Sequence, residues 1–83
     1  MSDVLHIDDR RLLWRCRRGM KELDVLLDRY ARAALPAATA EQKRALERFL
    51  ELPDPVLAAW LLGAELPAEA EFARLARDIT ACP

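Results

Sequence analysis

Glycines, prolines and helix-capping residues divide this 83-residue chain into five stretches, each with apolar residues at helical spacing. Apolar residues three and four positions apart share one side of a helix and can be buried together. Prolines and glycines between such stretches end or begin helices. The sequence predicts five helices, at about Asp8–Arg18, from Met20 or Lys21 to Ala34, from Thr39 to before Pro53, from Asp54-Pro55 to Gly63, and from near Pro67 onward.

The composition also favours helices over strands. Alanine, leucine, arginine and glutamate dominate, and these residues lose little side-chain freedom in a helix. Valine, isoleucine and threonine are scarce and never cluster, which argues against a sheet. A chain of this length forms one domain with a modest core. We expect an all-α, compact, five-helix bundle-like single domain over residues 1–83, with an ordered core at about 8–80.

Several local signals place the helix ends and the core. Thr39 and Gln42 have capping-box spacing, and we expect Gly19 and Gly63 to close helices, Gly19 with left-handed backbone. Trp60 is expected to be a core residue, although Trp14 suits either the core or an interface rim. The predicted buried stripes are Leu23, Leu26, Leu27, Tyr30 and Ala34; Leu46, Phe49 and Leu50; Val56, Leu57, Trp60 and Leu61; and Phe72, Leu75, Ala76 and Ile79.

The residues offer little support for catalysis, and we expect no enzyme activity. The one histidine, His6, and the cysteines Cys16 and Cys82 do not make a metal-ligand set. The two glycines are too far apart for a phosphate-binding loop. A nucleophilic Cys16–His6 pair stays open as an alternative. The simpler interpretation makes Cys16 a small core residue and both cysteines free thiols.

The net charge of −1 gives no general attraction to nucleic acids or membranes. The charges are uneven, because residues 1–34 hold eight Lys/Arg and six Asp/Glu, or +2, whereas residues 35–83 hold five and eight, or −3. The N-terminus resembles neither a secretory signal nor an organelle presequence. We therefore expect a cytoplasmic protein that does not insert into membranes and binds no nucleic acid.

The segment from Trp14 to Asp24 carries the most information. We expect Arg10, Trp14, Arg17 and Lys21 to lie roughly along one line of the first helix, with Arg11, Arg15 and Arg18 on an adjacent line. Gly19 would bring Arg18 close to Glu22, which places opposite charges beside a large aromatic residue. Arginine and tryptophan are frequent anchors of protein interfaces. The plainer interpretation is ordinary charge and cap chemistry at a helix junction.

The string Arg18-Gly19-Met20-Lys21-Glu22 matches the RGxxE motif of the SdhE family, which comprises FAD assembly factors of succinate dehydrogenase. The resemblance covers most of residues 10–80. It departs at Ala58, where relatives often carry an aromatic residue, and in the alanine-rich stretch 33–40. The further matching residues are Trp14, Cys16, Arg17, Leu23, Asp24, Phe49, Leu50, Asp54, Pro55, Leu57, Trp60 and Leu61.

This resemblance implies a five-helix protein that binds the flavoprotein subunit of succinate dehydrogenase and, in some bacteria, that of fumarate reductase. It implies that the factor promotes covalent FAD attachment to its partner and holds no stably bound cofactor itself. We expect partner contacts at Trp14, Arg15, Arg17, Arg18, Gly19, Lys21 and Glu22. Three alternatives are a small helical nucleic-acid-binding protein, an enzyme using Cys16 and a generic protein-interaction module.

Overall fold

The computed structural model describes residues 7–63 and 65–82, which form five α-helices, a short 3₁₀ helix and no strand. The elements follow the chain as α1 (Ile7–Arg15), α2 (Lys21–Ala34), η1 (Leu35–Ala37), α3 (Ala40–Leu50), α4 (Asp54–Leu61) and α5 (Ala70–Ala81). The predicted all-α fold is therefore confirmed. His6 lies outside the described residues, so the suggested Cys16–His6 pair has no structural account.

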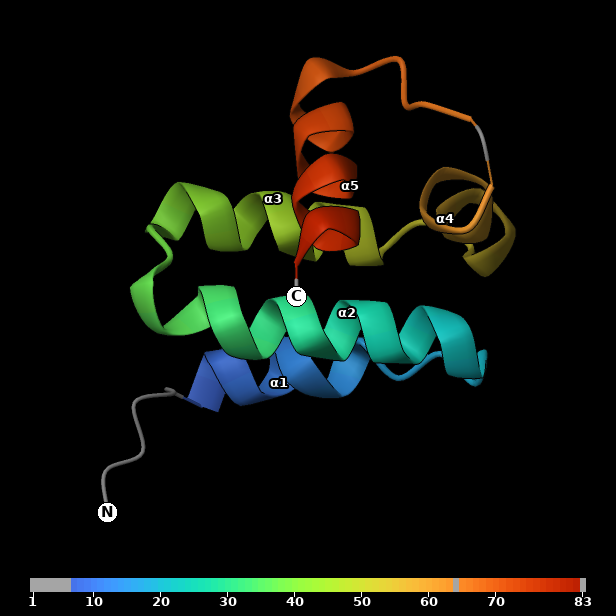
Figure 1. Cartoon of the computed structure of the whole chain (residues 1–83). Coiled ribbons are helices and arrows are strands. Elements are labelled where there is room, and N and C mark those ends of the chain that lie inside the picture. Colours follow the sequence, from blue (N-terminus) through green and yellow to red (C-terminus); the bar gives the residue numbers. More distant parts are fainter. Residues whose placement is uncertain (1–6, 64, 83) are drawn as a thin grey trace.

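The helices surround one core. Figure 1 shows α1 and α2 running side by side, α5 standing across them, and α4 at the side away from the α2–α3 connection. Helix α5 packs against α2, α3 and α4, while α1 packs against α2 and α3. The first and third helices therefore meet along a seam at the surface.

The predicted apolar stripes supply most of the core. Among the predicted residues, Leu26, Tyr30 and Trp60 are partly buried and pack against it. Trp60 and the buried Phe49 and Phe72 form a three-ring cluster with centroids 5.6–5.9 Å apart. Such tilted and edge-on ring pairs stabilise a core beyond the area they bury. The fully or nearly fully buried members are Leu12, Cys16, Leu23, Leu27, Ala31, Leu35, Leu46, Phe49, Leu50, Leu57, Leu61, Phe72, Leu75, Ala76 and Ile79.

Helix α3 begins as its sequence predicts. Thr39 accepts a hydrogen bond from the Gln42 backbone N–H, and the Gln42 side chain accepts one from the Thr39 N–H. These reciprocal bonds form a capping box, which satisfies two donors that a helix start otherwise leaves free. The predicted cap is confirmed.

Two predicted helix starts are wrong. Pro53, not Asp54, caps α4, and α5 begins at Ala70 rather than near Pro67. Gly63 closes α4 as predicted, and its N–H donates to the Ala58 carbonyl oxygen at 3.0 Å. Its backbone is not left-handed, since Gly19 alone among the described residues has a positive φ. Glycine is needed at position 63 for another reason: a Cβ there would lie 2.8 Å from the Ala59 carbonyl oxygen.

The first helix ends at Arg15, three residues earlier than predicted. The N–H groups of Cys16 and Arg17 still donate to carbonyls three residues back, as in a tightened last turn. The N–H of Arg18 instead donates to the side chain of Asp24. The predicted lines of side chains along α1 are therefore wrong, because Arg17, Arg18 and Lys21 do not belong to that helix.

Candidate functional site

The RGxxE string begins in the bend of residues 16–20, which joins α1 to α2, and ends at Glu22 in the first turn of α2. Gly19 is the pivot of this bend. Gly19 has φ +89°, a backbone conformation that glycine adopts without steric cost. The carboxylate of Asp24 accepts hydrogen bonds from the N–H of Arg18 at 2.7 Å and of Gly19 at 3.2 Å. One side chain from the first turn of α2 therefore fixes both peptides at the turning point.

The side chain of Arg18 ties this bend to the far half of the chain. Its Nε donates to Asp54 Oδ1 at 2.7 Å, Nη1 to the Leu50 carbonyl at 2.6 Å and Nη2 to the Leu52 carbonyl at 2.8 Å. These acceptors lie at the end of α3 and the start of α4. Charge-assisted hydrogen bonds of this kind are stronger than neutral ones. We call this arrangement the Arg18 clamp.

The expectation that Arg18 is displayed beside Glu22 is consequently wrong. Only 15% of the Arg18 side chain is exposed, and its ion-pair partner is Asp54. A guanidinium group has five donors in a planar fork, which suits several acceptors placed around it. The sequence did not indicate which acceptors these are, because Leu50, Leu52 and Asp54 lie 32–36 residues away.

The other predicted contact residues surround the clamp and face outward. Arg17, Gly19, Lys21 and Glu22 are exposed, as is Trp14, of which 69% is accessible. The Arg17 guanidinium lies over the Trp14 ring, 5.2 Å from its centroid, which is a cation–π arrangement. The structure therefore brings these side chains to one region, and their role in partner binding stays a prediction.

Two apolar side chains of this region were missing from the predicted contact set. Met20 in the bend is 38% exposed and Val25, three residues after Glu22 on α2, is 47% exposed. Together with Trp14 they make three of the five large apolar side chains that the described chain exposes. Exposed apolar groups beside fixed charges are typical of protein interfaces. The i, i+3 spacing of Glu22 and Val25 was the available sequence signal.

A shallow hollow separates the bend from the end of α3. Trp14, Arg15, Arg17 and Arg18 line one side, and Leu50, Glu51 and Asp54 line the other. Arg15 is half-buried there, and its Nη1 lies 3.7 Å from Glu47 Oε2. Open and polar, this hollow is suited to contact with a protein surface rather than to enclosing a small molecule.

The described residues contain no group of three or more potential metal ligands, and Cys16 is poorly suited to act as a nucleophile. Cys16 is fully buried and donates a weak hydrogen bond to the Leu12 carbonyl at 3.3 Å. Burial, followed by the nearby Asp28 carboxylate, raises the pKa of its thiol to about 12. The thiolate is the reactive form, so the prediction of a core cysteine is confirmed.

In the described parts of the chain, no helix has the length and apolar character that a membrane span requires.

Comparison with known proteins gives a consistent result. A family model described as "Flavinator of succinate dehydrogenase" matches residues 10–83. The FAD assembly factor SdhE of Coxiella burnetii is 40% identical over 70 residues, covering 84% of this chain and 85% of that protein. The SdhE of Legionella pneumophila strain Paris is 43% identical over 72 residues, covering 87% and 90%. That of Idiomarina loihiensis is 41% identical over 70 residues, covering 84% and 78%. The chain therefore belongs to the family of succinate dehydrogenase flavinators, as the RGxxE motif predicted.

Proposed function

We propose that this chain is an assembly factor that binds the flavoprotein subunit of succinate dehydrogenase and promotes its covalent attachment of FAD. Family membership supports this function over the nucleic-acid-binding and generic interaction alternatives. The flavoprotein subunit of fumarate reductase is a second partner under the same proposal. The FAD stays with the partner, and this chain holds no cofactor.

One observation carries the proposal: the Arg18 clamp fixes the bend from within, while Glu22, Gly19, Arg17 and Trp14 remain outside. A surface held in one conformation loses little entropy when a partner binds it. A Cβ at Gly19 would meet nothing within 4 Å, so the chain itself leaves that position open to a partner's backbone. Glu22 supplies an exposed carboxylate next to this opening.

Such a surface suits a factor that works by positioning rather than by catalysis. The described residues of the site offer a buried thiol with a raised pKa, arginines and carboxylates, and among them no nucleophile is paired with a base. Holding reacting groups in a productive orientation lowers a barrier by as much as roughly 7–11 kcal/mol in favourable cases. We infer that the bend clamps a mobile part of the flavoprotein, and that the partner performs the bond formation itself.

Glu22→Ala tests this function directly. We expect covalent flavin on the succinate dehydrogenase flavoprotein, measured by in-gel flavin fluorescence after denaturation, to fall sharply. The free energy of unfolding should change by less than about 0.5 kcal/mol, because Glu22 is exposed and has no partner within the described chain.

Glu41→Ala is the matched control, since Glu41 is also exposed and is also the second residue of its helix. It should leave flavin attachment at the wild-type level. Equal flavin fluorescence with both variants would show that Glu22 is only a helix-start residue, and persistence of the fluorescent band after deletion of the gene would remove the proposed function.

A further inference from the structure

A second, more enclosed depression lies in the seam between α1 and α3. It has a volume of about 490 Å³. Most of its lining is charged, with four cationic and two anionic side chains: Asp9, Arg11, Arg15, Lys43, Arg44 and Glu47. We call it the α1–α3 groove. Its excess of positive charge contrasts with the net charge of −1 of the whole chain.

Both anionic side chains already have cationic partners in the groove. Lys43 Nζ lies 3.0 Å from Asp9 Oδ1, and Asp9 is almost completely buried. Glu47 pairs with Arg15. Arg11 and Arg44 are exposed and make no ion pair or side-chain hydrogen bond within residues 7–63 and 65–82. Two guanidinium groups, one from each helix, thus remain available to an outside anion.

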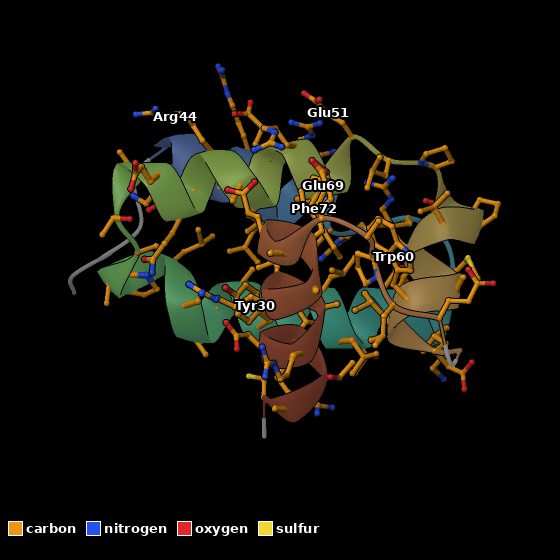
Figure 2. All side chains as sticks on the ribbon, turned by 90° about the horizontal axis from the view of Figure 1, so that it is seen from above. Tyr30, Arg44, Glu51, Trp60, Glu69 and Phe72 are labelled. Carbon is orange, nitrogen blue, oxygen red and sulfur yellow. The ribbon has the colours of Figure 1, made fainter. Side chains whose placement is uncertain are left out.

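The α1–α3 groove adjoins the hollow beside the bend rather than forming a separate site. Arg15 lines both the α1–α3 groove and the hollow beside the bend. Figure 2 shows Arg44 and Glu51 toward opposite ends of α3, both pointing away from the core. Because Glu51 lines the hollow and Arg44 the groove, a partner seated at the bend can extend along the seam.

The lining favours a protein segment over a phosphate group. The start of α3 would be the natural phosphate site here, because free N–H groups at a helix start bind such anions. The Thr39–Gln42 capping box already occupies two of these donors. Leu12 and Ala40 add an apolar lining, which a small hydrated anion does not use. Carboxylates on a peptide satisfy guanidinium groups equally well.

We propose that the α1–α3 groove binds an acidic segment of the client flavoprotein, whose carboxylates pair with Arg11 and Arg44. This rests on the proposed function for the identity of the partner. The groove would act as a second contact, adding electrostatic attraction and fixing the direction in which the partner leaves the bend.

Charge reversal tests the proposal. The variant Arg11→Glu/Arg44→Glu should bind the purified flavoprotein subunit about tenfold more weakly than wild type in 50 mM salt, measured by calorimetry. The difference should shrink in 500 mM salt, because exposed charges are then screened. The matched control Arg74→Glu/Arg77→Glu makes the same change in net charge on exposed residues of α5. Equal weakening in both variants would overturn the groove as a contact.

A peptide titration tests, without the flavoprotein, whether the α1–α3 groove binds an acidic segment. Hexaglutamate added to the ¹⁵N-labelled chain should shift amide signals of residues 9–15 and 40–47, and the shifts should vanish in Arg11→Glu/Arg44→Glu. No shift, or the same shifts from sodium phosphate at equal ionic strength, would contradict an acidic-peptide site. Failure of wild type to bind the flavoprotein would instead remove the proposed function and leave the peptide result to decide on the groove.

Discussion

Two connections between helices in this protein are built in opposite ways. The α1–α2 bend is held by polar side chains. Asp24 accepts hydrogen bonds from two of its N–H groups, and Arg18 donates to the end of α3 and the start of α4. In the α4–α5 connection, residues 62–63 and 65–69 make no side-chain hydrogen bond within the described chain, and only Pro67 is buried. Leu66 there is 81% exposed. The protein thus fixes the connection that carries its motif and leaves the other to packing.

The largest expected effect comes from removing the clamp. Arg18→Ala leaves Asp54 and three carbonyl groups without their donor, so we expect a loss of about 2–4 kcal/mol in the free energy of unfolding. Urea unfolding followed by circular dichroism measures this. For its neighbour Arg17, the side-chain interaction found in the described chain is the cation–π contact with the exposed Trp14 ring, so Arg17→Ala should cost at most about 1 kcal/mol. Similar losses for the two variants would refute the contrast between the connections.

Substitutions at Gly19 and Gly63 compare the same two connections, and their expected effects on the free energy of unfolding are of intermediate size. At Gly19 the strain comes from the positive φ alone, so Ala should cost about 1–2 kcal/mol and Asn distinctly less, because Asn tolerates left-handed backbone. At Gly63 any Cβ meets the Ala59 carbonyl, so Ala and Asn should cost similar amounts, about 1–3 kcal/mol. Thermal unfolding of the four variants gives the two rankings. If Gly19→Ala proved more stable than Gly19→Asn, the positive φ of Gly19 would not be the constraint.

The smallest expected effect is a difference in the chemical labelling of the two native cysteines. Cys16 lies at the base of the bend with its pKa raised to about 12, so at pH 8 only roughly one thiol in 10⁴ is ionised. Iodoacetamide should therefore modify the partly exposed Cys82 and spare Cys16, as read by mass spectrometry. In Arg18→Ala the bend opens more often, and Cys16 should react faster. Rapid labelling of Cys16 in wild type would mean that the bend is not fixed.

Cys16 also gives the bend a dependence on pH. Because its pKa is higher in the folded chain than in the unfolded one, the folded chain keeps this proton above pH 9 while the unfolded chain releases it. This contribution to stability is complete below pH 9 and is lost as pH rises toward 12. Comparing the unfolding free energies of wild type and Cys16→Ala across this range isolates the effect.

Features that depend on residues close together in the sequence were largely predicted. The Thr39–Gln42 cap, the start of α2 and the buried stripes of α3 and α5 follow from local spacing, and the structure confirms them. The stripe of α2 is confirmed except at its end, where Ala31 is buried and the predicted Ala34 is half-buried. The left-handed Gly19 was predicted for the same reason. The site was predicted as a region of the chain but not as a geometry, since the bonds that decide which way Arg18 points join residues 32–36 positions apart. Asp24 ends α1 early by a bond across the bend, which helix periodicity does not contain.

The Arg18 clamp can form only late in the synthesis of the chain. Arg18 leaves the ribosome more than thirty residues before Leu50, Leu52 and Asp54, so a nascent chain that ends short of α4 has no acceptors to hold the guanidinium. Copies that end before α4 therefore lack the Arg18 clamp, even though they contain the whole motif and the Asp24 bonds to the bend. The surface that we propose as the docking site for the client subunit is therefore complete only after α4 has been made.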